Sequence, residues 1–579
     1  MFRRAFCALA LLCGSIAQAQ TFIVNSDGDD NDPVDDLVTL REAIASANAL
    51  EGPDTILLPE RIQINTSVGY SISDDVEILG VAGAEAEIIS TADSAGASLF
   101  DLESGHQVHF ENLVIGGVQN QSTGVAACGN VTTNNIVVTG FYRAFYLCSA
   151  PVNLQVIRSS VIDNANALGG NAFNEGNTAV ALFDRSLIAN SSMFIRAYNA
   201  DVNVEIRNSL YVGEGAYLRI VGSTSMKIFD SALILSNSST LLTANYESHK
   251  DSPTSPSQYF YPSLEIIQST IAGHQTGYPV IKGEGANVRI AHTTIADNIN
   301  NQGHLLEFAG YKDPGSDQWQ GGVTIEHSVI DRYLTADVPI EIRNIDLKAR
   351  YSFVPAINRF SGTENIDFDA VTSLYQGAPS YLTDPVSDSF NLPYYLPQSG
   401  SPLIDAGDPE VVAGAGSVPE LEQRQSNRIL GAAIDIGATE YNHEPVLDDD
   451  ALKTAYKEQI AALDDPDGDI VLDLDNFVSD PDGHAIELID FYSEGAITFE
   501  PVTHIISGHQ KVFKEAVMAV KMTDETGLSA VKEMDWQPKS DGKASGGGSS
   551  GGGGSLPLTI LGAIALLGMG RTRRRRTAP

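Results

Sequence analysis

The stretch VEIRNSLYV, residues 204–212, sets the pattern that decides the fold. Apolar and polar residues alternate along it, as in a β-strand that buries one face, and an Asn-Ser pair lies in its middle. Phrases of the same kind recur before and after it, namely VHFENLVI (108–115), VTTNNIVV (131–138), VIRSSVI (156–162), ALFDRSLI (181–188), KIFDSALIL (227–235), LEIIQSTI (264–271), VRIAHTTI (288–295) and VTIEHSVI (323–330). The chain therefore carries an internal repeat of strand-forming segments.

The period of the repeat indicates how the strands are connected. Aligned at Leu113, Ile136, Ser160, Ser186, Ser209, Ser231, Ser269, Thr293 and Ser328, the phrases are 23, 24, 26, 23, 22, 38, 24 and 35 residues apart. A period near two dozen residues, made of strand formers with Gly and Asn, predicts a coil that adds one rung per repeat. Leucine-rich repeats share this period, but their leucine ladder is missing. The expected fold is a right-handed parallel β-helix.

An open end of a β-helix must be covered, because it exposes unpaired strands and core to water. Residues 39–50, TLREAIASANAL, predict a helix that covers the first end, with Thr39 and Glu42 as a capping box and one apolar stripe. Further along, Cys128 and Cys148 are 20 residues apart, a little under one rung. This spacing predicts a disulfide between neighbouring rungs, with a structural and not a redox role.

Export is indicated by the first 19 residues, where two arginines, an apolar run and Ala17-Gln18-Ala19 are typical of a secretory signal peptide cleaved near Ala19. The formal net charge of the 579-residue chain is −39, which disfavours nucleic acid as a partner and favours divalent cations.

Two of the repeat spacings are long because they contain insertions, residues 243–262 and 309–322. They begin 12 and 16 residues past the alignment points Ser231 and Thr293, so we expect them to leave the helix at one corner, two rungs apart. Aromatic faces with polar neighbours commonly hold sugars, and these insertions form the candidate ligand site. The alternative is that they only pack on the side of the helix. The candidate aromatic residues are Tyr246, Tyr259, Tyr261, Tyr311 and Trp319.

After Tyr441 the sequence becomes acidic, with the phrases DDPDGD (464–469) and VSDPDGHAIEL (478–488). Clustered carboxylates on Gly-containing turns suit Ca²⁺, which takes six to eight oxygen ligands. Calcium is therefore the expected cofactor, although tight turns with solvated charge would have the same sequence. The candidate ligands are Asp465, Asp467, Asp469, Asp480, Asp482 and Asp524.

Three segments resemble known bacterial families. Residues 21–59, with Arg41-Glu42-Ala43-Ile44, resemble the CSLREA-type N-terminal region of secreted β-helix proteins, although Val38 and Thr39 replace its cysteine and serine. SPLIDAGDP (401–409) and AIDIGATEY (433–441) resemble the choice-of-anchor Q closing segment. Residues 442–540 look like the cadherin-like or immunoglobulin-like β-sandwich modules of surface proteins.

The C-terminal tail resembles the GlyGly-CTERM sorting signal, with a Gly/Ser tether (541–555), a short apolar run and an arginine cluster (556–579). The resemblance implies transient anchoring in the inner membrane and cleavage near Gly554 and Ser555 by a rhomboid-type protease, rhombosortase. Type II secretion to the cell surface or the medium would follow. The family called rhombotarget A combines these features. The expected order is signal peptide 1–19, β-helix 20–441, acidic module 442–540, tether 541–555 and sorting segment 556–579.

No complete catalytic set is present in the sequence. Outside the Gly/Ser tether, Gly-x-Ser-x-Gly and HExxH are missing, and SGHQVHF (104–110) and VRIAH (288–292) are only partial matches to the phrases of pectin hydrolases. We predict ion pairs for Arg207, Arg289 and Arg343, and a stacked edge ladder for His292 and His327. Asp405, Asp408 and Asp435 are expected to bind backbone amides. The leading hypothesis is a non-enzymatic surface protein that binds glycans or other cells. The alternative is a lyase or hydrolase of an acidic polysaccharide.

Overall fold

The computed structural model describes two compact units, residues 1–441 and 442–579, each treated by itself below. The boundary falls where the sequence becomes acidic. The described residues are 19–31, 36–83, 86–92, 96–118, 122–148, 151–173, 177–213, 215–234, 240–250, 257–300, 304–314, 316–330, 340–345, 347–354, 365, 392–398, 400–441, 444–463, 468–481, 484–493, 497–510, 517–524 and 529–535.

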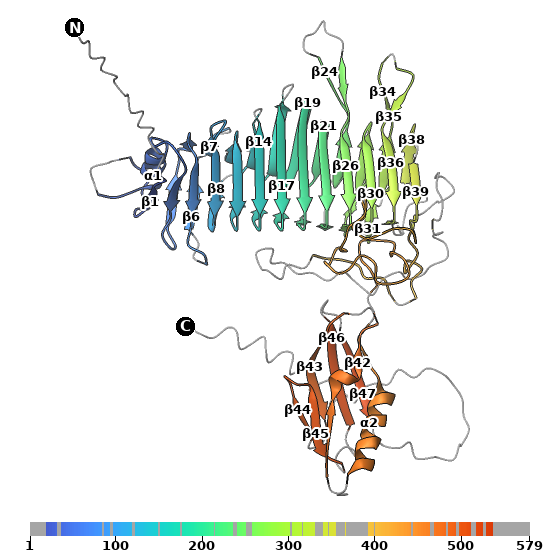
Figure 1. Cartoon of the computed structure of the whole chain (residues 1–579). Helices are drawn as coiled ribbons and strands as arrows, with labels where there is room; N and C mark the ends of the chain where they lie inside the picture. The colour runs from blue at the N-terminus through green and yellow to red at the C-terminus, as the bar shows by residue number, and fades with distance from the viewer. Residues whose placement is uncertain are drawn as a thin grey trace, which may run out of the picture. The chain divides into compact units, whose positions relative to one another are not determined.

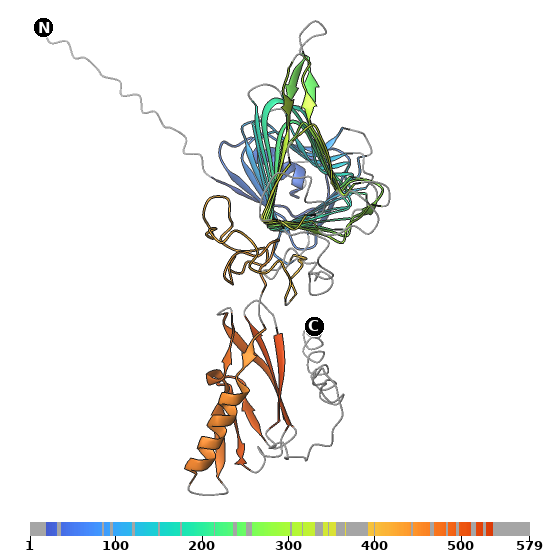
Figure 2. The same cartoon turned by 90° about the vertical axis from the view of Figure 1, so that its right-hand side faces the viewer.

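The first unit is a parallel β-helix, as the repeat predicts (Figure 1). Each strand pairs in parallel with the equivalent strand of the next rung, and the strands form three faces, which Figure 2 shows end-on. Face 1 consists of β4 (Tyr70–Ile72), β7 (Ser98–Leu102), β10 (Thr123–Ala127), β13 (Arg143–Leu147), β16 (Asn166–Phe173), the first parts of β19 (Ser192–Arg207) and β21 (Leu218–Phe229), β23 (Leu242–Asn245), β29 (Ile281–Glu284), β33 (Leu306–Ala309) and β38 (Ile340–Arg343).

Faces 2 and 3 follow face 1 in each rung. Face 2 consists of β1 (Thr21–Ile23), β2 (Asp54–Leu57), β5 (Val76–Leu79), β8 (Gln107–Glu111), β11 (Asn130–Asn134), β14 (Val152–Ile157), β17 (Thr178–Asp184), the second parts of β19 and β21, β26 (Ser263–Ile267), β30 (Asn287–Ala291), β36 (Gly322–Glu326) and β39 (Leu347–Arg350). Face 3 consists of β3 (Gln63–Thr66), β6 (Ala86–Ser90), β9 (Leu113–Gly117), β12 (Val137–Thr139), β15 (Ser160–Ile162), β18 (Leu187–Ala189), β20 (Leu210–Val212), β22 (Ala232–Ile234), β27 (Thr270–Ala272), β31 (Thr294–Ala296) and β37 (Val329–Ile330).

The corner between faces 2 and 3 is the same two-residue turn in successive rungs. Its first residue has a left-handed φ, as at Asn208 (47°) and His292 (50°), which asparagine tolerates better than most residues. Its second residue is in most rungs a buried Ser or Thr that accepts a hydrogen bond from the backbone N–H of its counterpart one rung earlier. Ser186 N–H thus donates to Ser209 Oγ at 3.1 Å, and Ser209 N–H to Ser231 Oγ at 3.2 Å. The recurring Asn-Ser of the sequence is this turn.

One alignment point of the sequence analysis is wrong. Ser159, and not Ser160, occupies the ladder position, because Ser159 N–H donates to Ser186 Oγ while Ser160 begins β15. In the phrase RSSVI the two serines are adjacent, and the alternation of apolar residues alone does not choose between them.

The N-terminal end of the core is covered by α1 (Leu40–Ala47), which begins at the predicted capping box of Thr39 and Glu42. Leu40, Ala43, Ile44 and Ala47 are buried against the first strands. Cys128 and Cys148 follow the paired strands β10 and β13, and they form a disulfide with a Cα–Cα distance of 4.8 Å.

The closing segment predicted at residues 401–441, together with residues 392–398 and 400 before it, lies along the last rungs. Its apolar residues Leu392 and Tyr395 pack on outward side chains of face 3, and Leu403 and Ile436 pack on Val329 and Phe353. Arg428 is fully buried and pairs with Glu440 at 2.6 Å. The segment is thus an integral part of the β-helix unit.

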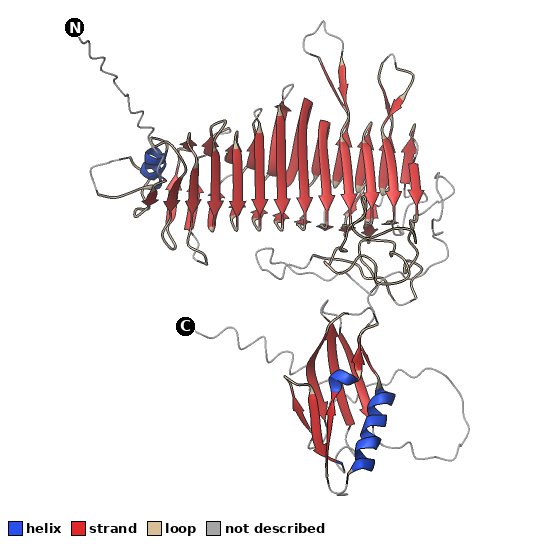
Figure 3. Cartoon of the chain, in the orientation of Figure 1, coloured by secondary structure: helices blue, strands red, loops and turns tan. Residues whose placement is uncertain are grey.

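The second unit contains two three-stranded antiparallel sheets around one core, together with a helix that the sequence analysis missed. In Figure 3 this helix, α2 (Asp449–Ala462), lies against the strands, and its Leu452 and Tyr456 are buried. The other elements are β40 (Val446–Leu447), β41 (Asp469–Asp473), a 3-10 helix (Leu474–Asn476), β42 (Val478–Ser479), β43 (Ile486–Ser493), β44 (Thr498–Glu500), β45 (Ile505–His509), β46 (Val517–Asp524) and β47 (Ser529–Asp535).

Among the described residues, none of the helices has the length and apolar character required to span a bilayer. The predicted sorting segment, residues 556–579, lies outside the described residues.

Candidate functional site

Both insertions fold into β-hairpins that leave the corner between faces 1 and 2 (Figures 1 and 2). The first hairpin, β24 (Glu247–His249) with β25 (Gln258–Phe260), connects β23 to β26. The second, β34 (Tyr311–Lys312) with β35 (Trp319–Gln320), connects β33 to β36. The rung between them turns the corner tightly at Gly285. The structure therefore brings the two insertions together at one corner, two rungs apart.

The four candidate tyrosines pack mainly on the hairpins themselves. The Tyr246 and Tyr311 rings stack at 3.5 Å between centroids, and the Tyr259 ring lies 5.5 Å from that of Tyr311. The Tyr261 hydroxyl donates a hydrogen bond to the carboxylate of Asp313. These contacts join one hairpin to the other. They also occupy aromatic faces that a sugar would need.

Gly285 allows this packing because it lies under both hairpins. It has a φ of 66°, and an added Cβ would lie 3.0 Å from Tyr246 Cβ and 3.1 Å from Tyr311 Cβ. Glycine tolerates this left-handed backbone and leaves space for the tyrosines.

Trp319, the fifth candidate, is different because its side chain is 48% exposed and lines a groove of about 800 Å³. The floor of the groove is the outer surface of face 2 on β26, β30, β36 and β39. One row of outward residues crosses these four strands in register, in the order Glu265, Arg289, Thr324 and Lys348.

The charges that line the groove are two cations and one anion, Arg289, Lys348 and Glu265. Arg289 is held in place, with 3.7 Å to Glu265, 3.1 Å to Glu326 and a 2.8 Å hydrogen bond to Ser417 of the closing segment. Lys348 is exposed. The groove therefore carries two cations on a chain of net charge −39, and one of them, Arg289, is paired with acids.

The groove has room beside Gly322. An added Cβ there would meet only Asn287 Oδ1 within 4 Å, at 3.8 Å, and the backbone φ is not left-handed. Gly322 alternates with the buried Val323 and therefore faces outward. A side chain placed at residue 322 would fill the groove without entering the core.

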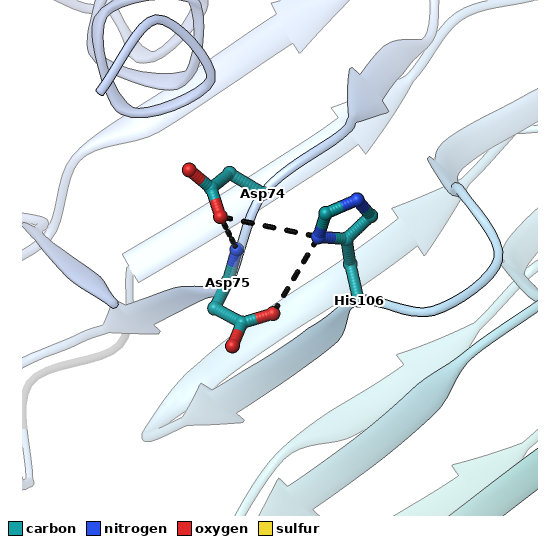
Figure 4. A group of neighbouring side chains, drawn as sticks. All are labelled: Asp74, Asp75 and His106. Carbon is teal, nitrogen blue, oxygen red and sulfur yellow. Dashed lines mark hydrogen bonds and ion pairs between the residues drawn. The ribbon is translucent and has the colours of Figure 1, made fainter. Parts of the chain in front are cut away.

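A second cluster lies at the same corner nearer the N-terminus. Asp74 and Asp75 precede β5, and His106 precedes β8, the neighbouring strand of face 2. His106 Nδ1 lies 3.9 Å from Asp74 Oδ1 and 3.6 Å from Asp75 Oδ1 (Figure 4). Both carboxylates also accept backbone hydrogen bonds, Asp74 from Asp75 N–H and Asp75 from Gln107 N–H. The phrase around His106 is recognisable in the sequence, but its acidic partners, 31 and 32 residues earlier, are not.

In the second unit the structure brings together two of the six predicted metal ligands. Asp480 and Asp524 lie beside His484, which the sequence analysis did not select although it follows the DPDG turn directly. Asp469 lies exposed at the start of β41 in the other sheet. Asp465, Asp467 and Asp482 lie outside the described residues, as do the processing residues Gly554 and Ser555, whereas Ala19 is the first described residue.

The polar residues of the closing segment are structural, as expected. Asp405 Oδ1 accepts Ala433 N–H at 2.9 Å, Asp435 Oδ1 accepts Asp405 N–H at 2.7 Å, and Asp408 pairs with Arg350 at 2.8 Å. The rings of His292 and His327 stack at 4.8 Å between centroids, which confirms the predicted ladder. Burial lowers the pKa of His327 to about 4, so this ladder is neutral at pH 7.

The predicted arginine ion pairs are also present. Arg207 lies 3.1 Å from Asp184, Arg289 has the partners given above, and Arg343 lies 2.6 Å from Glu307.

Fold and surface together define a parallel β-helix protein with a groove lined by Trp319, Arg289 and Lys348 beside two hairpins. No family model matches the chain, and no curated protein matches it. Among solved structures, the chain is similar to pectate lyase Pel9A, with 12% identity over 74% of this chain and 98% of that chain and a TM-score of 0.41.

Two modules of mannuronan C-5 epimerases from Azotobacter vinelandii are also similar in fold. The AlgE6 A-module has 12% identity over 57% of this chain and 90% of its own, with a TM-score of 0.32. The AlgE4 A-module has 12% identity over 57% of this chain and 92% of its own, with a TM-score of 0.29. The likeness is confined to the fold.

Proposed function

We propose that this protein binds a carboxylated polysaccharide in the groove on face 2. The observation that carries the proposal is the exposed Trp319 beside a row of outward polar residues that includes Arg289 and Lys348. An exposed indole offers a sugar ring an apolar face, and the cations attract carboxylates. The residues of this row follow one another along the helix axis at the strand spacing of about 4.8 Å, so they present a line of polar groups to an extended polymer.

The groove suits binding better than proton transfer. Arg289 is fixed between Glu265 and Glu326, so its orientation is set by the protein. An ion-paired guanidinium holds its protons firmly and is a poor general base.

The test uses the full chain and a panel of immobilised uronic acid polymers and neutral glucans. We expect binding to the uronic acid polymers that weakens as salt increases, since charge contacts are screened. Trp319→Ala should weaken binding about tenfold, equivalent to ~1.4 kcal/mol. Gly322→Ile should abolish binding, while Gly322→Ala, which adds only one methyl group at an open position, should keep most of it.

A control for the tyrosine cluster separates binding from packing. Tyr259→Phe keeps the ring in place, so it should bind like the wild type. Equal binding by Gly322→Ile and Gly322→Ala would show that the ligand lies elsewhere.

The alternative function is a polysaccharide lyase or glycoside hydrolase, which the cluster of Asp74, Asp75 and His106 favours. An imidazole is the commonest general acid–base group, and carboxylates beside it can orient it. The assay is incubation with the same acidic polymers, followed by measurement of reducing ends and unsaturated products. Product formation by the wild type and not by His106→Gln would establish the enzyme, whereas binding without products supports the binding protein.

We also propose that the chain is exported and displayed on, or released from, the bacterial surface after rhomboid-type cleavage of its tail. The signal peptide pattern and the order of glycines, apolar run and arginines support this proposal. Mass spectrometry of the exported protein tests it. A C-terminus near Gly554 or Ser555 is expected, and an intact Arg571–Pro579 end would contradict it.

A further inference from the structure

The end of one sheet in the second unit gathers three side chains of types that can bind a metal ion. Asp480 follows β42, His484 precedes β43, and Asp524 is the last residue of β46. Strand pairing places Ile486 opposite Asp524, so residues far apart in the sequence meet here.

The distances within this group leave space between the side chains. His484 Nδ1 lies 3.7 Å from Asp480 Oδ1 and 3.9 Å from Asp524 Oδ2, and the three ligand atoms lie within 4.8 Å of one another. These distances exceed those of hydrogen bonds, which end near 3.2 Å. They are close to the separation of about 3.3–3.5 Å between atoms that share one cation at ~2.0–2.1 Å in a tetrahedron.

The burial of His484 is a second, independent observation. Its side chain is only 5% exposed, and neither ring nitrogen has a hydrogen-bond partner among the described residues. A buried imidazole without hydrogen bonds to its ring nitrogens is costly, since these nitrogens have lost water and gained no hydrogen bond in return. Its Nδ1 faces two carboxylates whose side chains are fully buried.

We propose that Asp480, His484 and Asp524 form a structural site for a first-row divalent cation, with Zn²⁺ the best fit. One imidazole nitrogen with two carboxylate oxygens is typical of zinc, whereas Ca²⁺ takes six to eight oxygens. The cation ties the turn between β42 and β43 to the end of β46. This site differs from the calcium site expected from the sequence, because a nitrogen ligand replaces part of the oxygen set.

The test measures metal bound by the full chain after treatment with a chelator and dialysis against Zn²⁺ or Ca²⁺. We expect one equivalent of Zn²⁺ that is lost in His484→Asn. Two matched variants, His504→Asn and His106→Asn, should retain it, since His504 pairs with Asp475 and His106 belongs to the other unit. Asparagine suits residue 504, where φ is 50°.

Cobalt gives a readout independent of stability. Co²⁺ bound in place of Zn²⁺ should show the visible absorption of a four-coordinate site in the wild type and not in His484→Asn. Asp524→Asn, which keeps the side-chain shape, should weaken Zn²⁺ binding at least tenfold. Circular dichroism of each variant establishes that it is folded, and Zn²⁺ at 100 times its dissociation constant should raise the melting point of the second unit by about 10 °C.

Three results would overturn the proposal. The first is equal Zn²⁺ binding by the wild type and a folded His484→Asn. The second is loss of the bound Zn²⁺ in His106→Asn alone. The third is a melting point that rises with Ca²⁺ but not with Zn²⁺.

Discussion

Replacing Arg428 by methionine should release the closing segment from the β-helix. The Arg428 guanidinium is fully buried, lies 2.6 Å from Glu440, donates to the Gly437 carbonyl at 2.8 Å and contacts His292 Nδ1 at 3.1 Å. Methionine has a similar volume but leaves the Glu440 carboxylate buried without its cation. Breaking a buried pair on one side costs about 3–5 kcal/mol.

Hydrogen exchange measures this loss locally. The amides of Ile436 and Gly437 donate to Leu403 and His327, so they exchange only when the segment opens. A loss of about 3–5 kcal/mol corresponds to exchange at least about 100-fold faster for the peptide 433–441. The matched control is Arg350→Met, because Arg350 also pairs with the closing segment, through Asp408, but its side chain is 55% exposed. An exposed pair of this kind contributes only about 0–1 kcal/mol.

A double variant tests the electrostatic reason. Arg428→Met with Glu440→Gln removes both charges, so it should recover much of the protection that the single variant loses. If Arg428→Met and Arg350→Met accelerate exchange equally, burial of the pair is not what holds the segment.

Three further predictions concern the ladder and the hairpins. Desolvation raises the pKa of Asp230 to about 7, so the folded state binds the Asp230 proton more tightly than the unfolded state does. The contribution of this group to stability therefore falls as pH rises from about 4 to 7. Asp230→Asn should raise the melting point at pH 8 and change it little at pH 5. Ser209→Ala leaves the buried Ser186 N–H without its acceptor, and denaturant unfolding should show a loss of about 1–3 kcal/mol, against a smaller loss for the surface change Ser225→Ala. Gly285→Ala strains a left-handed φ and crowds Tyr246 and Tyr311, so proteolysis should cut the hairpins faster. The control is Gly283→Ala, whose Cβ would lie 3.2 Å from Phe308 and which should change proteolysis of the hairpins less.

The fold could be predicted from the sequence because each rung repeats the same local rule. Alternation indicated the strands, the period indicated the coil, and the capping box of Thr39 and Glu42 located α1. The helix α2 was missed, although Asp448 is an N-cap and Asp449 pairs with Lys453 four residues on. Its hydrophobic face is narrow, since only Leu452 and Tyr456 among its residues are buried. The acidic composition around the helix also suggested turns.

The site could be predicted only in part, for a physical reason. The spacing of the insertions placed five aromatic residues at one corner, but only side-chain packing decides that the tyrosines stack on one another while Trp319 remains exposed. The groove itself combines β26, β30, β36 and β39, and cross-strand neighbours such as Glu265 and Arg289 become visible only once the register is known. His484 was overlooked for the same reason, because its partner Asp524 is 40 residues away in the sequence.

The constant turn between faces 2 and 3 also determines where this protein can acquire new parts. Because hydrogen bonds to Ser and Thr hydroxyls tie successive rungs together at that corner in most of the coil, an added residue there would break these bonds, and a shift of the next strand by one position would turn its core residues outward. The corner between faces 1 and 2 has no such constraint, since it accommodates Gly285 in one rung and a whole hairpin in the next. The corner between faces 1 and 2 can therefore serve as a series of insertion sites, one per rung, where segments of very different length can be exchanged without changing the register of the strands.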